Sequence, residues 1–374
     1  MSNRPLDYQL NTEVGASKFS FSKVFIDPML VLCLLILSIL GIFILYSASG
    51  QSNLMVLRQS IYLLIGLAFM FFISRLDQSI YKSFLIHLFW IGLFLLCWVL
   101  IFPAKGYNTD RWIDLGFITF QPSETLRLIL PLAVSSYLTR SQHSPSIKDW
   151  SIVILATLTC SYLIFRQPDL DLALIVLASG FIPVFLAGFP IVMISIFLVV
   201  ILGSSPFIWK SLSPYMQERV ITLFNPGSDL HGAGWSIAQS KTAIGSGGLT
   251  GKGYLSGTQS QLDFIPESHS DMIFSVIGEE FGFLGISLLL IIYLIVIYRV
   301  FRIAFTSDSE FTRLSCSSLG FIFLIYVFIN TSMAVGTLPV VGVPLPFISQ
   351  GGTSILIHLV AFGFVLSMKK RQTW

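Results

Sequence analysis

Ten apolar stretches, each long enough to cross the roughly 30 Å hydrocarbon core of a bilayer, constrain this chain more than any other feature. They lie near residues 28–48, 57–75, 80–102, 122–139, 150–165, 170–187, 190–209, 271–299, 314–335 and 350–368. Only 11% of the 374 residues are charged, whereas soluble domains carry about 25%. The sequence therefore predicts an all-α polytopic membrane protein with about ten transmembrane helices.

The distribution of charge predicts the orientation of these helices. Thirteen of the 22 lysines and arginines fall in segments that share a side with the N-terminus, and most of those on the other side lie in two long loops. Since the positive-inside bias counts least in long loops, both termini are expected to be cytoplasmic. Twelve of the nineteen acids lie on or just under the opposite surface, so any chemistry is expected to face outward.

The chain is expected to form a single transmembrane domain at 28–369, between cytoplasmic tails at 1–27 and 370–374. Its longest loop, the extracytoplasmic loop 210–270 between the seventh and eighth spans, has no transmembrane character. Trp235 and several isoleucines and leucines in it predict a folded cap with short amphipathic helices.

The cysteine pattern and the net charge exclude other classes of protein. The four cysteines lie far apart in apolar runs and are expected to be buried thiols, neither disulfide-bonded nor metal-bound. The net charge of +3 is too small to imply a nucleic-acid partner.

An acid-bearing loop runs directly into the eighth span. It carries Glu267, His269 and Asp271, and Glu279 and Glu280 follow inside the span. His269 is expected to be a solvated loop residue. A carboxylate about 12 Å deeper than Asp271, as Glu279 would be on a helix, is costly unless it faces protein or water, which makes it a functional candidate.

Two roles are open for Asp271. Its carboxylate could cap the first turn of the helix, and it could also act as a general base kept ionised by the helix N-terminus. The two roles are compatible, and both are expected of this residue. At 100° per residue, Glu279 lies about 80° from Asp271 around the helix axis and Glu280 about 180°. Glu279 is therefore the expected partner in a shared cavity.

Three further motifs each have a structural and a functional interpretation. The glycine-rich stretch 244–254 lacks the P-loop spacing; it is either a flexible turn or a backbone surface for a phosphate-bearing ligand, with Lys241 and Lys252 supplying charge. Glu124 and Arg127, at i and i+3, either form an ion pair that lets both enter the membrane or act in catalysis. Pro168 predicts an outer turn, with Asp169 as the cap of the next helix.

Four stretches together resemble the SEDS (RodA/FtsW/SpoVE) family of bacterial cell-wall polymerases, and are most similar to its RodA branch. These stretches are DRWIDLGFITFQPSE (110–124), RQPDL (166–170), the long block at 238–285 and LPVVGVPLPFISQGGTS (338–354). The ten-span map with both termini inside agrees with the fold of that family.

The resemblance implies a peptidoglycan glycosyltransferase that polymerises lipid II on the outer face of the bacterial cytoplasmic membrane during cell elongation. It implies a class B penicillin-binding protein and the elongation machinery as protein partners, and the lipids of the membrane as the surroundings of the helices. The family's essential aspartate falls on Asp271, and its acidic–basic pair falls on Glu124 and Arg127. No ligand cluster in the sequence demands a metal or other cofactor, and a divalent cation could bridge pyrophosphate to a carboxylate.

In such a reaction Asp271 would take the proton from the attacking 4-hydroxyl, while cations stabilise the leaving pyrophosphate. The candidate substrate contacts are Arg111, Lys241, Lys252, Glu267 and Gln239, and the candidate supporting residues are Glu124, Arg127 and Glu279.

The departures of the chain from the family pattern include two near these stretches. Asp171 stands where the family commonly has glycine, and Gln350 stands where tyrosine is common. Two other functions stay open: a lipid II flippase, and a non-catalytic scaffold for a penicillin-binding protein. The buried ionisable groups cluster in the outer half, which favours an outward-facing enzyme.

Overall fold

The computed structural model describes residues 27–369, apart from 103–110, 112, 115–118, 142–143, 213, 225–231 and 263. In this part of the chain ten helices of 16 to 33 residues correspond to the ten apolar stretches. They are α1 (Pro28–Ala48), α2 (Asn53–Ser74), α3 (Gln78–Ile101), α4 (Pro122–Leu138), α5 (Ile147–Arg166), α6 (Leu170–Leu186), α7 (Ile191–Ser211), α11 (Ile273–Phe305), α12 (Glu310–Ala334) and α13 (Gly352–Ser367).

Local signals set where several helices begin. Asp27 precedes Pro28, and its carboxylate accepts a hydrogen bond from the Leu30 amide at 3.1 Å. Ser146 and Asp149 form a capping box on α5. Asp169 accepts from the Leu172 amide at 3.2 Å, so the predicted cap of α6 is confirmed.

The outer surfaces of the helices are apolar, as lipid-facing surfaces require. On α2, for example, Leu57, Leu64 and Phe72 are each more than half exposed, which would be an aggregation hazard in water. Six helices of the described chain (α1, α2, α3, α5, α11 and α12) are long and apolar enough to cross a membrane, and α6 and α13 are shorter apolar helices. The predicted multi-pass, all-helical class is confirmed; the count of ten crossings and the side of each terminus remain predictions.

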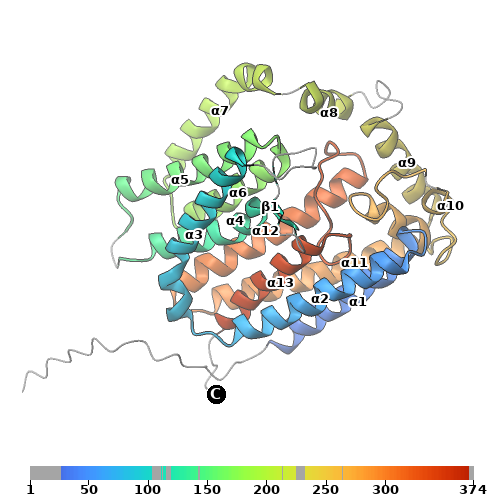
Figure 1. The fold of residues 1–374 in the computed structure, drawn as a ribbon, viewed down its shortest axis with the longest axis horizontal. Coiled ribbons are helices and arrows are strands. Elements are labelled where there is room, and N and C mark those ends of the chain that lie inside the picture. The colour runs from blue at the N-terminus through green and yellow to red at the C-terminus, as the bar shows by residue number, and fades with distance from the viewer. Residues whose placement is uncertain are drawn as a thin grey trace, which may run out of the picture.

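The helices pack around α12, which contacts α4, α6, α11 and α13. Along the edge of the bundle α13 lies against α2, and α1 lies against α11 (Figure 1). By contrast, α7 has no more than marginal contact with any other helix of the described chain. It rises away from the bundle, and α8 follows it at the rim (Figure 1).

The predicted cap in the long loop is confirmed as three short helices and turns. These are α8 (Pro214–Phe224), α9 (Ala233–Ser246) and α10 (Thr258–Gln261), of which α9 packs on α11 and α8 packs on α9. A two-residue antiparallel pair, β1 (Ile113–Asp114) with β2 (Thr119–Phe120), lies before α4.

A break in α11 joins this cap to the membrane bundle. Gly282 has φ 64° and ψ −160°, so the helix does not continue through it. The Glu279 and Glu280 carbonyls instead accept from the amides of Lys252 and Gly253, each at 3.0 Å. In exchange, the amides of residues 283 and 284 donate to the carbonyls of residues 248 and 249, at 2.9 and 3.0 Å. The glycine segment 247–253 therefore supplies the hydrogen bonds that the break removes.

Candidate active site

A cavity of about 740 Å³ opens between α6, α8, α12 and the segment 338–344. Leu172, Ile175, Val220 and Ile329 contribute an apolar wall. The charged side chains that line it come from segments far apart in the sequence: Arg111, Glu124, Asp169, Asp171 and Arg219. Such an arrangement suits a ligand with both an apolar and an anionic part.

Asp271 lies beside this cavity, in a turn before α11. Its main-chain carbonyl accepts a hydrogen bond from Asn330 Nδ2 of α12 at 2.9 Å, which holds the turn in place. The position that a Cβ would take on Gly342, a cavity-lining residue, is 3.8 Å from Asp271 Oδ2 and 3.9 Å from Asp171 Oδ2. Two carboxylates therefore converge on one exposed glycine.

The prediction that Asp271 caps α11 is wrong. The N-cap residue is Met272, without a side-chain hydrogen bond. The backbone of residues 267–272 closes a turn in which the Ser270 and Met272 amides both donate to the Glu267 carbonyl. With the chain turned in this way, the Asp271 carboxylate lies near Gly342, which lines the cavity.

The environment of Asp271 favours its protonated form more than water does. Burial, followed by the negative charge of Glu267 and then that of Asp171, raises the pKa of Asp271 to about 6, against the opposing effect of Arg219. A carboxyl with a pKa near 6 is ionised at neutral pH yet binds a proton much more tightly than an ordinary aspartate. This is the range in which a carboxylate serves as a general base.

Asp171 joins three elements at the cavity. Its Oδ2 atom is 3.0 Å from Arg219 Nη1 of α8 and accepts a hydrogen bond from the Gly342 amide at 3.2 Å. The sequence flagged Asp171 as a departure from the family, but it gave no reason to pair it with Arg219. That pairing joins α6 to α8, which lies beyond α7 at the rim (Figure 1).

Arg111 is held by the turn between α5 and α6. Its Nε donates to the Gln167 carbonyl at 2.9 Å, a second guanidinium nitrogen donates to the Pro168 carbonyl, and Nη1 lies 3.3 Å from Asp169 Oδ2. Gln121 also donates to Asp169, at 3.2 Å. Arg111 therefore lines the cavity as a fixed cation, and its contact with substrate stays a prediction.

Glu124 and Arg127 form the predicted ion pair, at 2.9 Å. Arg127 is buried and also reaches across the bundle to Tyr326, Ser354 and His358, with its guanidinium 4.5 Å from the centre of the Tyr326 ring. Glu124 and Tyr326 line the cavity, and Arg127 lies behind them. The pair thus supports the inner wall of the cavity.

Glu279 does not share a cavity with Asp271, and this part of the prediction is wrong. Its buried carboxylate accepts from Lys252 Nζ at 2.7 Å, and the amides of Gln259 and Ser260 donate to it at 2.9 and 3.1 Å. Glu280 faces α1 instead, where Ser47 donates to it. The break in α11 and the folded loop around it give each acid a structural partner that helix phase alone could not reveal.

The glycine-rich stretch is a structural turn. The amides of Lys252 and Gly253 donate to α11 carbonyls, so they are not free to bind a phosphate, and Lys252 is paired with Glu279. A Cβ on Gly247 would lie 2.0 Å from the Gly278 carbonyl oxygen, which shows that the segment packs directly on the α11 backbone.

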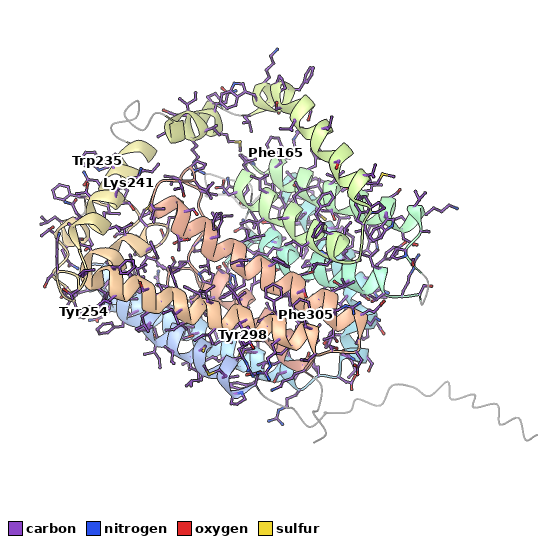
Figure 2. The ribbon with its side chains drawn as sticks, turned by 180° about the vertical axis from the view of Figure 1, so that it is seen from behind. Phe165, Trp235, Lys241, Tyr254, Tyr298 and Phe305 are labelled. Atoms are coloured by element: carbon purple, nitrogen blue, oxygen red, sulfur yellow. The ribbon has the colours of Figure 1, made fainter. Side chains whose placement is uncertain are left out.

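The remaining candidates lie on the cap and in the turn. Lys241 and Gln239 are on α9, where Lys241 lies against Gly336 at the end of α12. Lys241 and Trp235 are at the same end of the molecule as Tyr254 (Figure 2). Glu267 accepts from Ser270 Oγ at 2.8 Å and lies 3.8 Å from His269; the latter is half-buried rather than fully solvated.

The sequence did not identify Arg219, Asn330 or Gly342 as site residues. Asn330 carried a signal, because a fully buried amide inside an apolar span needs a partner. The described part of the chain contains no group of three or more His, Cys, Asp or Glu side chains that could hold a metal ion.

The fold and the cavity define a multi-pass membrane protein with a pocket lined by carboxylates and arginines near the N-termini of α4, α6 and α11. The family model FtsW/RodA/SpoVE, described as cell cycle protein, matches residues 27–373. The chain belongs to this family, as the sequence motifs predicted.

Its relatives include the peptidoglycan glycosyltransferase MrdB of Escherichia coli K12, with 39% identity over 96% of this chain and 97% of that protein. Stage V sporulation protein E of Bacillus subtilis is 32% identical over 92% of this chain and 97% of that protein.

Solved structures share the fold. A chain of the structure "Structural coordination of polymerization and crosslinking by a peptidoglycan synthase complex" superposes with a TM-score of 0.79 and 30% identity, over 91% of this chain and 97% of that chain. The rod shape determining protein RodA of Thermus thermophilus has a TM-score of 0.70 and 27% identity, over 93% and 98%.

Proposed function

We propose that this chain is a peptidoglycan glycosyltransferase of the RodA type, which polymerises lipid II on the outer face of the bacterial cytoplasmic membrane with Asp271 as general base. The observation that carries the proposal is the half-buried Asp271 carboxylate, with its raised pKa, beside a cavity that combines fixed arginines with an apolar wall. The names of the relatives support the reaction class.

The chemistry requires three groups around the reacting sugar. A sugar 4-hydroxyl oxygen forms a bond to the anomeric carbon of a second saccharide, the bond from that carbon to the diphosphate breaks, and the hydroxyl proton passes to Asp271. Arg111 lines the cavity as a cation for the developing diphosphate charge, and Arg219 is a second. The apolar wall formed by α6 and α12 suits the polyprenyl chain.

The supporting residues have a defined place in this proposal. Glu124 and Arg127 keep the inner wall of the cavity fixed. Glu279 and Lys252 keep the cap on α11, and α11 carries Asp271 at its outer end. Lys241, Glu267 and Gln239 are proposed contacts for the parts of the substrate that extend beyond the cavity.

A partner that cross-links the glycan is part of the proposal. One solved structure that shares this fold is a synthase complex that couples polymerisation to crosslinking. We assign the same kind of partner to this chain, a class B penicillin-binding protein of the elongation machinery. In this proposal both termini of the chain lie in the cytoplasm.

The test is a lipid II polymerisation assay with the purified protein and its partner, in which the length of the glycan product is measured. Asp271→Ala is expected to abolish polymerisation, and the control Glu310→Gln, which changes an exposed acid at the start of α12, is expected to retain it. Undiminished polymerisation by Asp271→Ala would refute the base assignment.

Reconstitution of the same protein into vesicles, with both lipid II movement and glycan formation measured, distinguishes the competing functions. A flippase would move lipid II between leaflets without forming glycan. A non-catalytic scaffold would do neither, and every outer acid would then tolerate substitution.

A further inference from the structure

We propose that Asp171 is a positioning residue for this reaction: by binding both Arg219 of α8 and the Gly342 amide, it fixes these elements around Asp271 and sets the charge that Asp271 meets. The inference rests on the proposed function, because it concerns the same carboxylate. It assigns a role to a residue that departs from the family's usual glycine.

Asp171 joins three cavity-lining elements through one carboxylate oxygen. Asp171 Oδ2 is 3.0 Å from Arg219 Nη1 and 3.2 Å from the Gly342 amide nitrogen. One oxygen atom thus connects α6, α8 and the segment 338–344, all of which line the cavity. Glycine, the usual residue of the family at this position, has no side chain and would leave these three elements without this connection.

Few contacts hold α8 to the rest of the molecule described. The preceding helix, α7, has only marginal contact with the other helices described, and α8 packs on α9. The Arg219–Asp171 ion pair therefore ties α8 to α6 across the cavity. Both side chains are about one-quarter exposed or less, so the pair is shielded in part from the screening that weakens surface ion pairs.

Asp171 also acts on Asp271 through its charge. Three charged groups act on the Asp271 carboxyl: Glu267 from its own turn, Asp171 from α6 and Arg219 from α8. Asp171 and Glu267 favour the protonated carboxyl, whereas Arg219 favours the ionised one. Removal of Asp171 or of Arg219 should therefore change the acidity of Asp271 in opposite directions.

The test is the pH dependence of kcat/KM for lipid II polymerisation by Asp171→Asn and Arg219→Gln, each normalised to its own plateau. Removing one nearby charge is expected to change the proton affinity of the Asp271 carboxyl by roughly three- to tenfold. At pH 5 we expect the normalised rate of Asp171→Asn to rise roughly three- to fivefold above that of the wild type. That of Arg219→Gln should fall by roughly three- to tenfold.

Two further variants complete the design. The double variant Asp171→Asn with Arg219→Gln should return the low-pH side of the rate profile toward that of the wild type. Glu218→Gln, which removes an exposed acid next to Arg219 on α8, should leave the profile unchanged. If Asp171→Asn is unstable, Asp171→Ser makes the same change of charge.

Shifts in the same direction, or no shift, would overturn the positioning role, and the proposed function would stand if Asp271→Ala is inactive. Activity retained by Asp271→Ala would instead refute the proposed function itself.

Discussion

Gly251 offers a sharp test of how the cap is joined to α11. A Cβ on Gly251 would lie 2.1 Å from the Glu280 carbonyl oxygen, and the residue has φ +81°. Gly248 in the same segment has φ +57°, but a Cβ there would meet nothing within 4 Å. Alanine at either position is forced into the left-handed region, and only at Gly251 does it also collide with backbone.

The two glycines therefore separate the cost of conformation from the cost of collision. Left-handed backbone costs about 1–2 kcal/mol for a residue with a Cβ, which is the expected destabilisation for Gly248→Ala. Gly251→Ala must also push the segment away from α11. This breaks the bonds from the Lys252 and Gly253 amides, at about 0.5–1.5 kcal/mol each. Gly251→Ala should thus cost about 2–5 kcal/mol.

The apparent unfolding temperature of the detergent-purified protein measures this difference. A thiol-reactive fluorophore reports unfolding, since Cys33, Cys160 and Cys316 are buried in the fold. The Gly251→Ala midpoint should lie several degrees below that of Gly248→Ala. Equal midpoints would refute the claim that segment 247–253 packs on the α11 backbone.

Three other predictions concern the cavity. Arg127→Leu should cost about 3–5 kcal/mol, because it leaves the Glu124 carboxylate buried without its partner, and Arg127→Leu with Glu124→Gln should recover part of this loss in the same unfolding assay. Gly342→Ala should fold normally, since its Cβ meets only ordinary contacts at 3.8 and 3.9 Å. It should lower polymerisation because the added methyl group lies within 4 Å of both the Asp171 and the Asp271 carboxylates, and full activity would contradict this placement. The rate of the wild type should rise with pH through about 6 as Asp271 ionises. The contribution of the same group to stability has the opposite trend: its folded pKa is raised above 3.8, so the contribution is complete below pH 3.8 and is lost as pH rises through about 6. A rate independent of pH between 5 and 7 would contradict the role of Asp271 as base.

The helices could be predicted from the sequence because lipid imposes a length and a composition on each segment separately. Local spacing also sufficed for the Glu124–Arg127 pair and for the cap at Asp169. Each of these features depends on residues within a few positions of one another.

The features that could not be predicted depend on contacts between distant segments. Helix phase assigned Glu279 to the Asp271 cavity, but phase assumes a helix that starts at Asp271 and a partner on the same face. The actual partners of Glu279 come from residues 252–260, which lie in the loop before α11 and not on the helix itself. In the same way, the Asp171–Arg219 ion pair joins α6 to α8, although the two residues are 48 positions apart in the sequence.

The exchange of hydrogen bonds at Gly282 means that α11 has two halves joined through another segment. The amides of Phe283 and Leu284 sit within the apolar part of the chain, yet their acceptors belong to the cap. Hydrogen–deuterium exchange at these two amides would therefore follow the docking of the cap and not the fraying of the helix. Since Asp271 precedes the outer half of α11, the two amides would also report from a distance on how firmly the proposed base is held.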